Sequence, residues 1–256
     1  MSLARFFTEE RFAADAVEAS LAAEDLHHAV RVLRLRVGEE VELVDRAGQV
    51  LHLLLTHCSP DEVKGEILSR RLAETRRLQL HLLQGLPRGS KVEEIIQKGV
   101  ELGLDRFYPL LTQQSQIRLD ESAKRKKHER WTKIAEMAAS QSGRDYIPEI
   151  MEAQSLETCL RTLREDDLAH EHRVLNFICW ENEKRMTLAH AILQQRLRDH
   201  EQVRILVGPE GGFAEKEVEM AIKYGFTPVS LGSNILRTET AGPAVLAMIG
   251  FAMELL

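Results

Sequence analysis

The stretch "RILVGPEGGFAEKEV" (residues 204–218) decides the fold class, because it passes from a strand through a glycine-rich loop directly into a helix. Strands and helices alternate in this way along the chain after about residue 72. Such alternation is typical of a parallel α/β sheet. The predicted strands are continuous apolar runs, as expected when helices cover both faces of the sheet.

The elements expected in this part of the chain follow from its periodicity. Strands are predicted at residues 77–85, 105–112, 172–180, 203–208 and 228–232. Helices are predicted at residues 91–103, 122–141, 187–197, 214–225 and 243–256. Ser90 and Glu93 form a predicted capping box at the start of the first helix, and Gly103 suits its C-terminal end.

The first 72 residues have a different pattern, rich in short strands. Two apolar runs within residues 39–57 flank a turn at residues 46–49, and residues 62–72 supply a third strand. Before them, residues 24–40 carry Val30, Leu33 and Val37 at helical spacing. Short strands joined by tight turns imply a small barrel or sandwich. We therefore expect two domains, at residues 1–72 and 73–256.

Composition indicates an ordinary globular protein, with 44% hydrophobic and 29% charged residues among 256. The start of the chain shows no secretory signal, and the most apolar segment, residues 243–256, is shorter than the roughly 20 residues of a membrane span. The 3 cysteines are widely spaced, which favours a reducing cytoplasm over disulfides or a zinc site. No histidine pair has an acidic or cysteine partner at ligand spacing in the sequence, so no metal is expected. The short apolar segment means that no membrane partner is expected either.

Charge is unevenly distributed along the chain. The net charge is −6, but residues 76–148 carry +5 and the remainder −11. The basic excess peaks at "KRKKHER" (residues 124–130). Such a run is either a solvated helix face or a surface for an anionic partner, and a nearby binding loop favours the second reading.

The glycine loop of residues 208–212 lies where the carboxyl end of a parallel strand is expected, which is where α/β sheets bind ligands. Without a Cβ, these glycines let backbone groups approach a ligand closely, and a tight strand-to-helix turn is the alternative explanation. The loop is neither a P-loop nor a dinucleotide-binding motif. Glu210 would repel a phosphate, so a cationic or neutral ligand fits better.

A second loop, "LGSNILRTETAGPAVLAMIG" (residues 231–250), leads into the apolar terminal helix. Thr238 or Thr240 can cap this helix, Glu239 suits its positive end, and Pro243 is tolerated in a first turn. Arg237 has no such explanation, because a helix N-terminus disfavours a cation. A bound group at this junction would account for it.

These two loops, "GPEGGF" (residues 208–213) and "LGSNILRTETA" (residues 231–241), resemble the C-terminal signatures of the RsmE family of SPOUT methyltransferases. That family makes N3-methyluridine in small-subunit ribosomal RNA. "QGLPRGSKVEEIIQKGVELG", "YPLLTQQS" and "RWTKIAEMAASQSGRDYIPEI" are similar to other blocks of the family, and "RFF" and "HHAVRVLRLRVGEE" resemble its PUA-like domain. Asn234 stands where the family usually has arginine.

The resemblance implies a SPOUT-type α/β fold, which is a parallel sheet with a C-terminal trefoil knot, plus an N-terminal PUA-like β-barrel. It also implies a homodimer that binds S-adenosyl-L-methionine (AdoMet) and acts on ribosomal RNA or the small ribosomal subunit in the cytoplasm. Another SPOUT activity, on tRNA or on a ribose 2′-O position, is the first alternative. A non-catalytic RNA-binding assembly factor is the second.

The resemblance also implies residue roles. Arg237 would stabilise the uridine anion, and Glu239 would serve as a base or, more simply, favour the helix N-terminus. The implied cofactor-binding residues are Glu181, Gly208, Glu210, Gly211, Gly212, Leu231, Gly232, Ser233, Ile235 and Leu236. The residues expected to bind RNA are Arg5, Arg31, Arg34, Arg118, Lys124, Arg125, Lys126 and Lys127.

Overall fold

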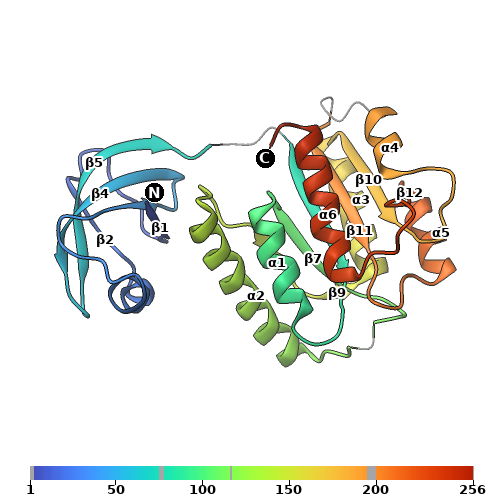
Figure 1. Cartoon of the computed structure of the whole chain (residues 1–256), viewed down its shortest axis with the longest axis horizontal. Coiled ribbons are helices and arrows are strands. Elements are labelled where there is room, and N and C mark those ends of the chain that lie inside the picture. Colours follow the sequence, from blue (N-terminus) through green and yellow to red (C-terminus); the bar gives the residue numbers. More distant parts are fainter. Residues whose placement is uncertain (1–2, 75–77, 116, 195–199, 256) are drawn as a thin grey trace. The chain divides into compact units, whose positions relative to one another are not determined.

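The computed structural model describes residues 3–74, 78–115, 117–194 and 200–255, which Figure 1 shows in ribbon form. The chain splits into two compact units. Unit 1 comprises Met1–Thr75 and Glu136–Ile147, and unit 2 comprises Arg76–Ala135 and Pro148–Leu256. The first boundary lies close to the one predicted after residue 72. The two units are not contiguous in sequence, however, because Glu136–Ile147 also belongs to unit 1.

Unit 1 is built on a mixed sheet with the order β1-β3-β4-β5-β2 in the described part of the chain. β1 pairs with β3 in parallel, and the other neighbours are antiparallel. Alternate residues of β3 and β4 face a core that includes Val41, Leu43, Leu51 and Leu53. The strands are β1 (Ala4–Phe7), β2 (Glu18–Ser20), β3 (Glu40–Val44), β4 (Gln49–Cys58) and β5 (Val63–Leu72).

The helical spacing within residues 24–40 corresponds to helical backbone only as far as residue 32. A 3₁₀ turn (Ala23–Asp25) continues through residues 26–27 into a short π-helix (His28–Val32), so residues 23–32 are helical without a break. Arg34 has a φ of 57°, a left-handed conformation that ends helical geometry. Leu33 and Val37 are consequently exposed, so their helical spacing does not mark a core face.

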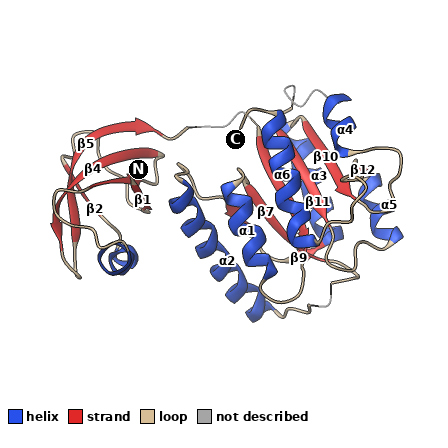
Figure 2. Cartoon of the chain, in the orientation of Figure 1, coloured by secondary structure: helices blue, strands red, loops and turns tan. Residues whose placement is uncertain are grey.

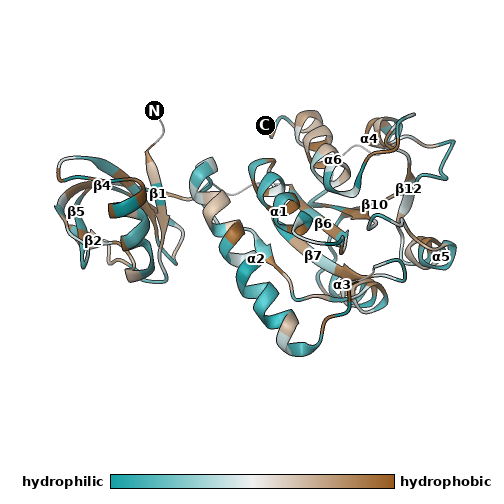
Figure 3. Ribbon diagram, turned by 60° about the horizontal axis from the view of Figure 1, so that its bottom comes forward, coloured by the Kyte–Doolittle hydropathy of each residue, from teal (hydrophilic) through white to brown (hydrophobic). Residues whose placement is uncertain are grey.

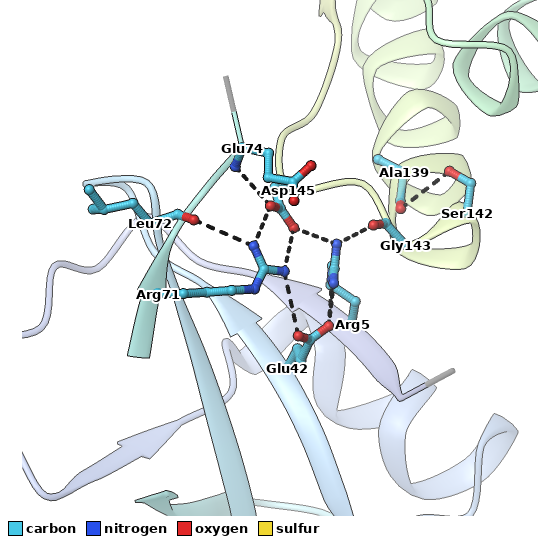
Figure 4. Close-up of polar contacts among 9 residues, drawn as sticks. All are labelled: Arg5, Glu42, Arg71, Leu72, Glu74, Ala139, Ser142, Gly143 and Asp145. Atoms are coloured by element: carbon cyan, nitrogen blue, oxygen red, sulfur yellow. Dashed lines mark hydrogen bonds and ion pairs between the residues drawn. The ribbon is translucent and has the colours of Figure 1, made fainter. Parts of the chain in front are cut away.

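Ion pairs explain why the Glu136–Ile147 segment belongs to unit 1 (Figure 4). The Asp145 carboxylate accepts hydrogen bonds from Arg5 Nη1 at 2.7 Å and from Arg71 Nη2 at 2.8 Å. Arg5 also donates to Glu42 through Nε at 3.0 Å and to the carbonyl of Gly143. Burial alone would raise the pKa of Asp145, but the hydrogen bonds from Arg71 and the Glu74 amide outweigh it and lower the pKa.

Unit 2 contains a parallel sheet, as the alternation of strands and helices predicts. In the described residues its order is β12-β10-β11-β6-β7-β8, and β9 pairs with β7. β6 and β11 lie at the centre and are almost entirely buried. The strands are β6 (Gln79–Gly85), β7 (Arg106–Leu111), β8 (Glu149–Ile150), β9 (Gln154–Ser155), β10 (Val174–Cys179), β11 (Gln202–Val207) and β12 (Thr227–Val229).

Helices cover both faces of this sheet (Figure 2). α1 and α6 pack against each other, and α6 contacts β6 and β11, whereas α3 and α5 pack together and contact β7 and β12 respectively. The helices are α1 (Lys91–Glu101), α2 (Glu121–Ser142), α3 (Leu156–His170), α4 (Leu188–Gln194), α5 (Glu215–Lys223) and α6 (Thr238–Ala252). The predicted end of α4 at residues 195–197 and the predicted strand residue 77 lie outside the described residues.

Several local predictions are corrected by the structure. α3 has no counterpart among the predicted helices, although the Ser155 side chain caps it by accepting from the Thr158 amide. Ser90 makes no side-chain capping bond at the start of α1. Pro243 lies more than a turn inside α6, which begins at Thr238, and not in its first turn.

Hydropathy follows this architecture (Figure 3). The strands of unit 2 carry brown, apolar stretches, and α2 is largely teal along its length. Trp131 and Ala135 nevertheless bury one side of α2. None of the helices in the described part of the chain combines the length and hydropathy that a bilayer crossing requires. The trefoil knot is not read from the sheet order and stays a prediction.

Candidate active site

A cavity of about 980 Å³ lies beside the carboxyl ends of β10, β11 and β12. The loops that follow these three strands supply most of its lining. This is the position at which parallel α/β sheets bind ligands. Every residue that lines the cavity belongs to unit 2.

The structure brings both glycine loops to this one cavity. All residues expected to hold the cofactor or to catalyse line it, although they span almost sixty positions of the chain. They are Glu181, Gly208, Glu210, Gly211, Gly212, Leu231, Gly232, Ser233, Ile235, Leu236, Arg237 and Glu239.

The first loop needs its glycines for packing as well as for any ligand. A Cβ on Gly208 would lie 3.1 Å from the backbone of Gly212. Gly212 has a φ of 69°, and a Cβ there would come within 2.8 Å of Glu181 Oε1. The Glu181 carboxylate therefore lies directly against the loop, which allows it to form one side of the cavity.

Arg237 occupies the N-cap position of α6 with extended backbone angles and makes no side-chain capping bond. Its side chain is exposed at the cavity, and no hydrogen bond or ion pair engages its guanidinium within the described residues. The capping role predicted for Thr238 or Thr240 is wrong. Thr238 is buried and donates its hydroxyl to the Gly208 carbonyl at 2.6 Å.

Lys91, the first residue of α1, joins the two loops electrostatically. Its Nζ lies 3.0 Å from Glu210 Oε1 and 3.3 Å from Glu239 Oε2. Its hydrogen bond to Glu210 is the main reason that the pKa of Lys91 is raised. The pKa of Glu239 is lowered by a hydrogen bond from its own backbone amide and then by Lys91. Lys91 and Glu239 are thus both fully charged at neutral pH.

Several cavity residues were not among the predicted site residues. Lys91 was placed only in a helix, and no local pattern links it to loops more than a hundred positions away. Residues 182–184 follow β10 as the glycine loop follows β11, so the carboxyl-end rule could have found them. The further lining residues are Cys179, Trp180, Asn182, Glu183, Lys184, Thr187, Val207, Pro209, Phe213, Ser230, Asn234, Thr238 and Ala241.

The residues expected to bind RNA differ in their availability. Arg31, Arg34, Arg118, Arg125 and Lys126 are exposed. No ion pair joins Arg125 or Lys126 to the part of the chain that the structure describes.

Two lysines of the basic run are partly occupied by neighbours within α2. Lys124 pairs with Glu121 at 2.7 Å, and Lys127 lies over the Trp131 ring at 5.5 Å. Arg5 is only 9% exposed and its guanidinium is occupied by Glu42 and Asp145. Its expected RNA contact is therefore corrected to a structural role in unit 1.

One histidine pair, His170 and His172, has an acidic neighbour in the structure. Asp166 Oδ1 lies 3.0 Å from His170 Nδ1, and the potential ligand atoms of Asp166, His170 and His172 all lie within 4.8 Å of one another. Asp166 precedes His170 by four residues, so one helix face brings them together. The expectation that no histidine pair has such a partner is wrong here, although none of the three lines the cavity.

Comparisons with known proteins place this fold and site in a class. Residues 74–250 match the RNA methyltransferase domain, and residues 21–68 match the RNA methyltransferase PUA domain. The chain thus combines an RNA methyltransferase domain with an RNA methyltransferase PUA domain.

Curated relatives narrow this class to one family. Ribosomal RNA small subunit methyltransferase E of Bacillus subtilis is 35% identical over 243 residues, which cover 93% of this chain and 91% of the relative. The protein of the same name from Synechocystis is 32% identical over 237 residues, covering 92% and 73%. The chain belongs to the ribosomal RNA small subunit methyltransferase E (RsmE) family.

A solved structure agrees with this assignment. Ribosomal RNA small subunit methyltransferase E from Neisseria gonorrhoeae, bound to S-adenosyl methionine, matches with a TM-score of 0.83 and 27% identity. The match covers 98% of each chain.

Proposed function

We propose that this chain transfers a methyl group from AdoMet to N3 of a specific uridine in small-subunit ribosomal RNA. Membership of the RsmE family supports the substrate class and the cofactor. The observation that carries the proposal is the meeting of two glycine loops and Arg237 in one cavity, where the Arg237 guanidinium has no hydrogen-bond or ion-pair partner among the described residues.

The donor set of the cavity fits a cationic cofactor. The side chains of Glu181, Glu183, Glu210 and Glu239 bring carboxylates to it, and the glycine loop brings backbone groups close. When bound, AdoMet supplies an electrophilic methyl on its sulfonium, which leaves as a neutral thioether. The residues that would hold it are Glu181, Gly208, Glu210, Gly211, Gly212, Leu231, Gly232, Ser233, Ile235 and Leu236.

Arg237 has the properties required to stabilise the reacting uracil. Attack by N3 requires loss of its weakly acidic proton, which we propose passes to water, and negative charge then spreads over O2 and O4. A guanidinium offers several N–H donors in a fixed plane and carries its charge at any working pH. Because no hydrogen bond or ion pair occupies it within the described chain, it is available to the developing anion.

Glu239 is a poor candidate for the general base. Its lowered pKa makes the carboxylate a weaker proton acceptor, and Lys91 already pairs with it. We assign Glu239 and Lys91 to holding the entrance of α6 in place. This choice between the two roles leaves Arg237 as the residue proposed to contact the uracil.

RNA is proposed to bind through exposed arginines and lysines. Arg31 and Arg34 supply them in unit 1, and Arg118, Arg125 and Lys126 supply them in unit 2, where the partly exposed Lys124 and Lys127 add to the positive charge. Their charge suits the phosphate backbone, which dominates affinity for nucleic acid. Since ribosomal RNA is the substrate, we propose a cytoplasmic location.

A homodimer is also proposed. α6 is apolar nearly all round, yet Met248 and Phe251 are 43% and 83% exposed in the single chain. A second subunit would cover them, as such a helix requires. Light scattering tests this: the chain should have a dimer mass, and Phe251→Glu should weaken the dimer. A wild-type chain that stays monomeric at micromolar concentration contradicts it.

Methyl transfer from labelled AdoMet tests the proposed activity. The chain should label small-subunit RNA, supplied as assembled subunits or as free RNA, and nuclease digestion should release N3-methyluridine. Label in a ribose 2′-O position or in tRNA alone would contradict the proposed target. AdoMet binding without any transfer would indicate a non-catalytic RNA-binding protein.

A further inference from the structure

Gln84, Thr238 and Gly208 form a closed hydrogen-bonded triangle beneath the cavity. The Gln84 side-chain Nε2 lies 2.9 Å from Thr238 Oγ1 and 3.2 Å from the Gly208 carbonyl. Thr238 Oγ1 donates to the same Gly208 carbonyl at 2.6 Å. A hydroxyl has one hydrogen to donate and lone pairs to accept, so Thr238 satisfies both contacts at once.

The triangle joins three segments that are remote in sequence. Gln84 lies near the end of β6, Gly208 begins the first glycine loop after β11, and Thr238 is the first residue of α6. Thr238 stands between Arg237 and Glu239, which both line the cavity. A displacement of Thr238 would therefore move Arg237 relative to the first glycine loop.

Close packing around the triangle leaves little room for adjustment. A Cβ on Gly85 would lie 2.5 Å from Pro209 Cδ, and one on Gly242 would lie 3.0 Å from Leu82 Cδ2. β6 thus packs so closely against the first glycine loop and against α6 that neither glycine has room for a side chain. In such a junction, a lost hydrogen bond is not replaced by a small shift of the chain.

Gln84 is a costly residue for a purely structural position. It is fully buried, and its Oε1 has no hydrogen-bond partner in the described chain. An apolar side chain of similar length would fill the same space without burying an unpaired oxygen. Residues that break a packing rule in this way are commonly found where function requires them.

We propose that Gln84 and Thr238 are positioning residues, which hold the N-cap of α6 against Gly208 so that Arg237 faces the bound cofactor. The pair acts through Arg237 and the first glycine loop and does not touch the substrate. The inference rests on the proposed methyl transfer and names the residues that set its geometry.

The test uses variants that separate the hydroxyl from its volume. Thr238→Val removes the hydroxyl and keeps the shape, whereas Thr238→Ser keeps the hydroxyl. Gln84→Met removes the amide and keeps the length. Thr132→Val is the matched control, because the Thr132 hydroxyl has no partner in the described chain and lies outside the cavity. Calorimetry gives AdoMet affinity, single turnover at saturating AdoMet gives the rate, and thermal unfolding gives stability.

We expect Thr238→Val and Gln84→Met each to lower the saturated single-turnover rate about tenfold or more, since small misplacements of reacting groups are costly. AdoMet affinity should fall less than the rate. Thr238→Ser should stay within about twofold of wild type in both, and the double variant should be no slower than the slower single variant, because the two residues act as one unit.

A Thr238→Val rate within twofold of the Thr132→Val rate would overturn the inference. Equal losses in Thr238→Ser and Thr238→Val at matched thermal stability would also overturn it, because the hydroxyl would then not be responsible. If Thr238→Val does not fold, the comparison of Thr238→Ser with Gln84→Met decides in the same way. Failure of the wild type to bind AdoMet or to methylate contradicts the proposed function instead.

Discussion

Lys91 Nζ lies 3.3 Å from Oε2 of Glu239, so the carboxylate two residues after Arg237 already has a cation beside it. The same ammonium reaches Glu210 at 3.0 Å. One lysine thereby connects the first glycine loop to the start of α6. Because Glu239 pairs with Lys91, we assign it a structural role at the start of α6 and not the role of general base.

Glu239→Gln should consequently lose less than about tenfold in single-turnover methylation, well below the loss of about 10²-fold or more typical for a general base. A hydrogen bond from its own backbone amide and the pairing with Lys91 lower the pKa of Glu239 from its usual value, so the carboxylate stays charged around neutral pH. The pH–rate profiles of wild type and Glu239→Gln should therefore run parallel between pH 5 and 8. A step in the wild-type profile that the variant lacks would restore the base assignment.

The basic run on α2 should bind RNA through Arg125 and Lys126, the exposed members that no ion pair occupies in the described chain. Replacing Arg125 and Lys126 with glutamine should reduce the salt dependence of RNA affinity by about 1.5 in log–log slope, because each phosphate contact contributes about 0.7–0.9. The matched control replaces the exposed Lys216 and Lys223 of α5, which should leave the slope unchanged. Equal slopes in both double variants would reduce the run to a solvated helix face.

Arg5→Ala should act on stability and not on RNA contact. The change leaves Asp145 and Glu42 without one of their cations, and breaking a buried pair of this kind costs about 3 kcal/mol or more of unfolding free energy. Arg31→Ala, at an exposed arginine, is the control and should change stability by less than about 0.5 kcal/mol. Chemical denaturation measures both, and equal effects of the two substitutions would contradict the role assigned to Arg5.

Much of the site was predictable because a simple rule governs it. Parallel strands end at one edge of the sheet, so glycine loops at 208–212 and 231–236 that follow such strands had to lie near each other. Arg237 stood out because capping chemistry gave it no role. The structure confirms both points, since one cavity contains the two loops and Arg237.

The remaining features depend on contacts between distant segments. Thr238 resembles a helix cap in the sequence, but the Gly208 carbonyl thirty positions away accepts its hydroxyl instead. Arg5 looks like a free surface charge until Glu42 and Asp145 are placed beside it. The helical spacing of residues 30–37 is overridden where Arg34 adopts a left-handed conformation. No local pattern records these partners.

Acid should destabilise unit 2 through His81. Burial, and then the charge of Arg204, lower the pKa of His81 to about 3. An unfolded histidine titrates near about 6.5, so between these values only the unfolded chain takes up the proton. The unfolding free energy should therefore fall by up to about 1.4 kcal/mol per pH unit below pH 6.5 on account of this residue.

His81→Gln removes that contribution, so the stability difference between wild type and variant should shrink by about 2 kcal/mol from pH 7 to pH 5. The exposed His190→Gln is the control and should show no such trend. Urea unfolding at the two pH values provides the measurement. A wild-type–His81→Gln difference that does not change with pH would show that His81 is protonated in the folded protein.

Arg237 is proposed to stabilise the uracil anion during methyl transfer in the cavity, and Arg237→Ala removes this guanidinium. Single-turnover transfer to small-subunit RNA should slow by about 10²-fold or more, the typical cost of removing one donor to a developing anion. AdoMet affinity should stay within about threefold of wild type, because the interaction is stronger in the transition state than in the ground state. Methylation by Arg237→Ala at nearly the wild-type rate would contradict the account.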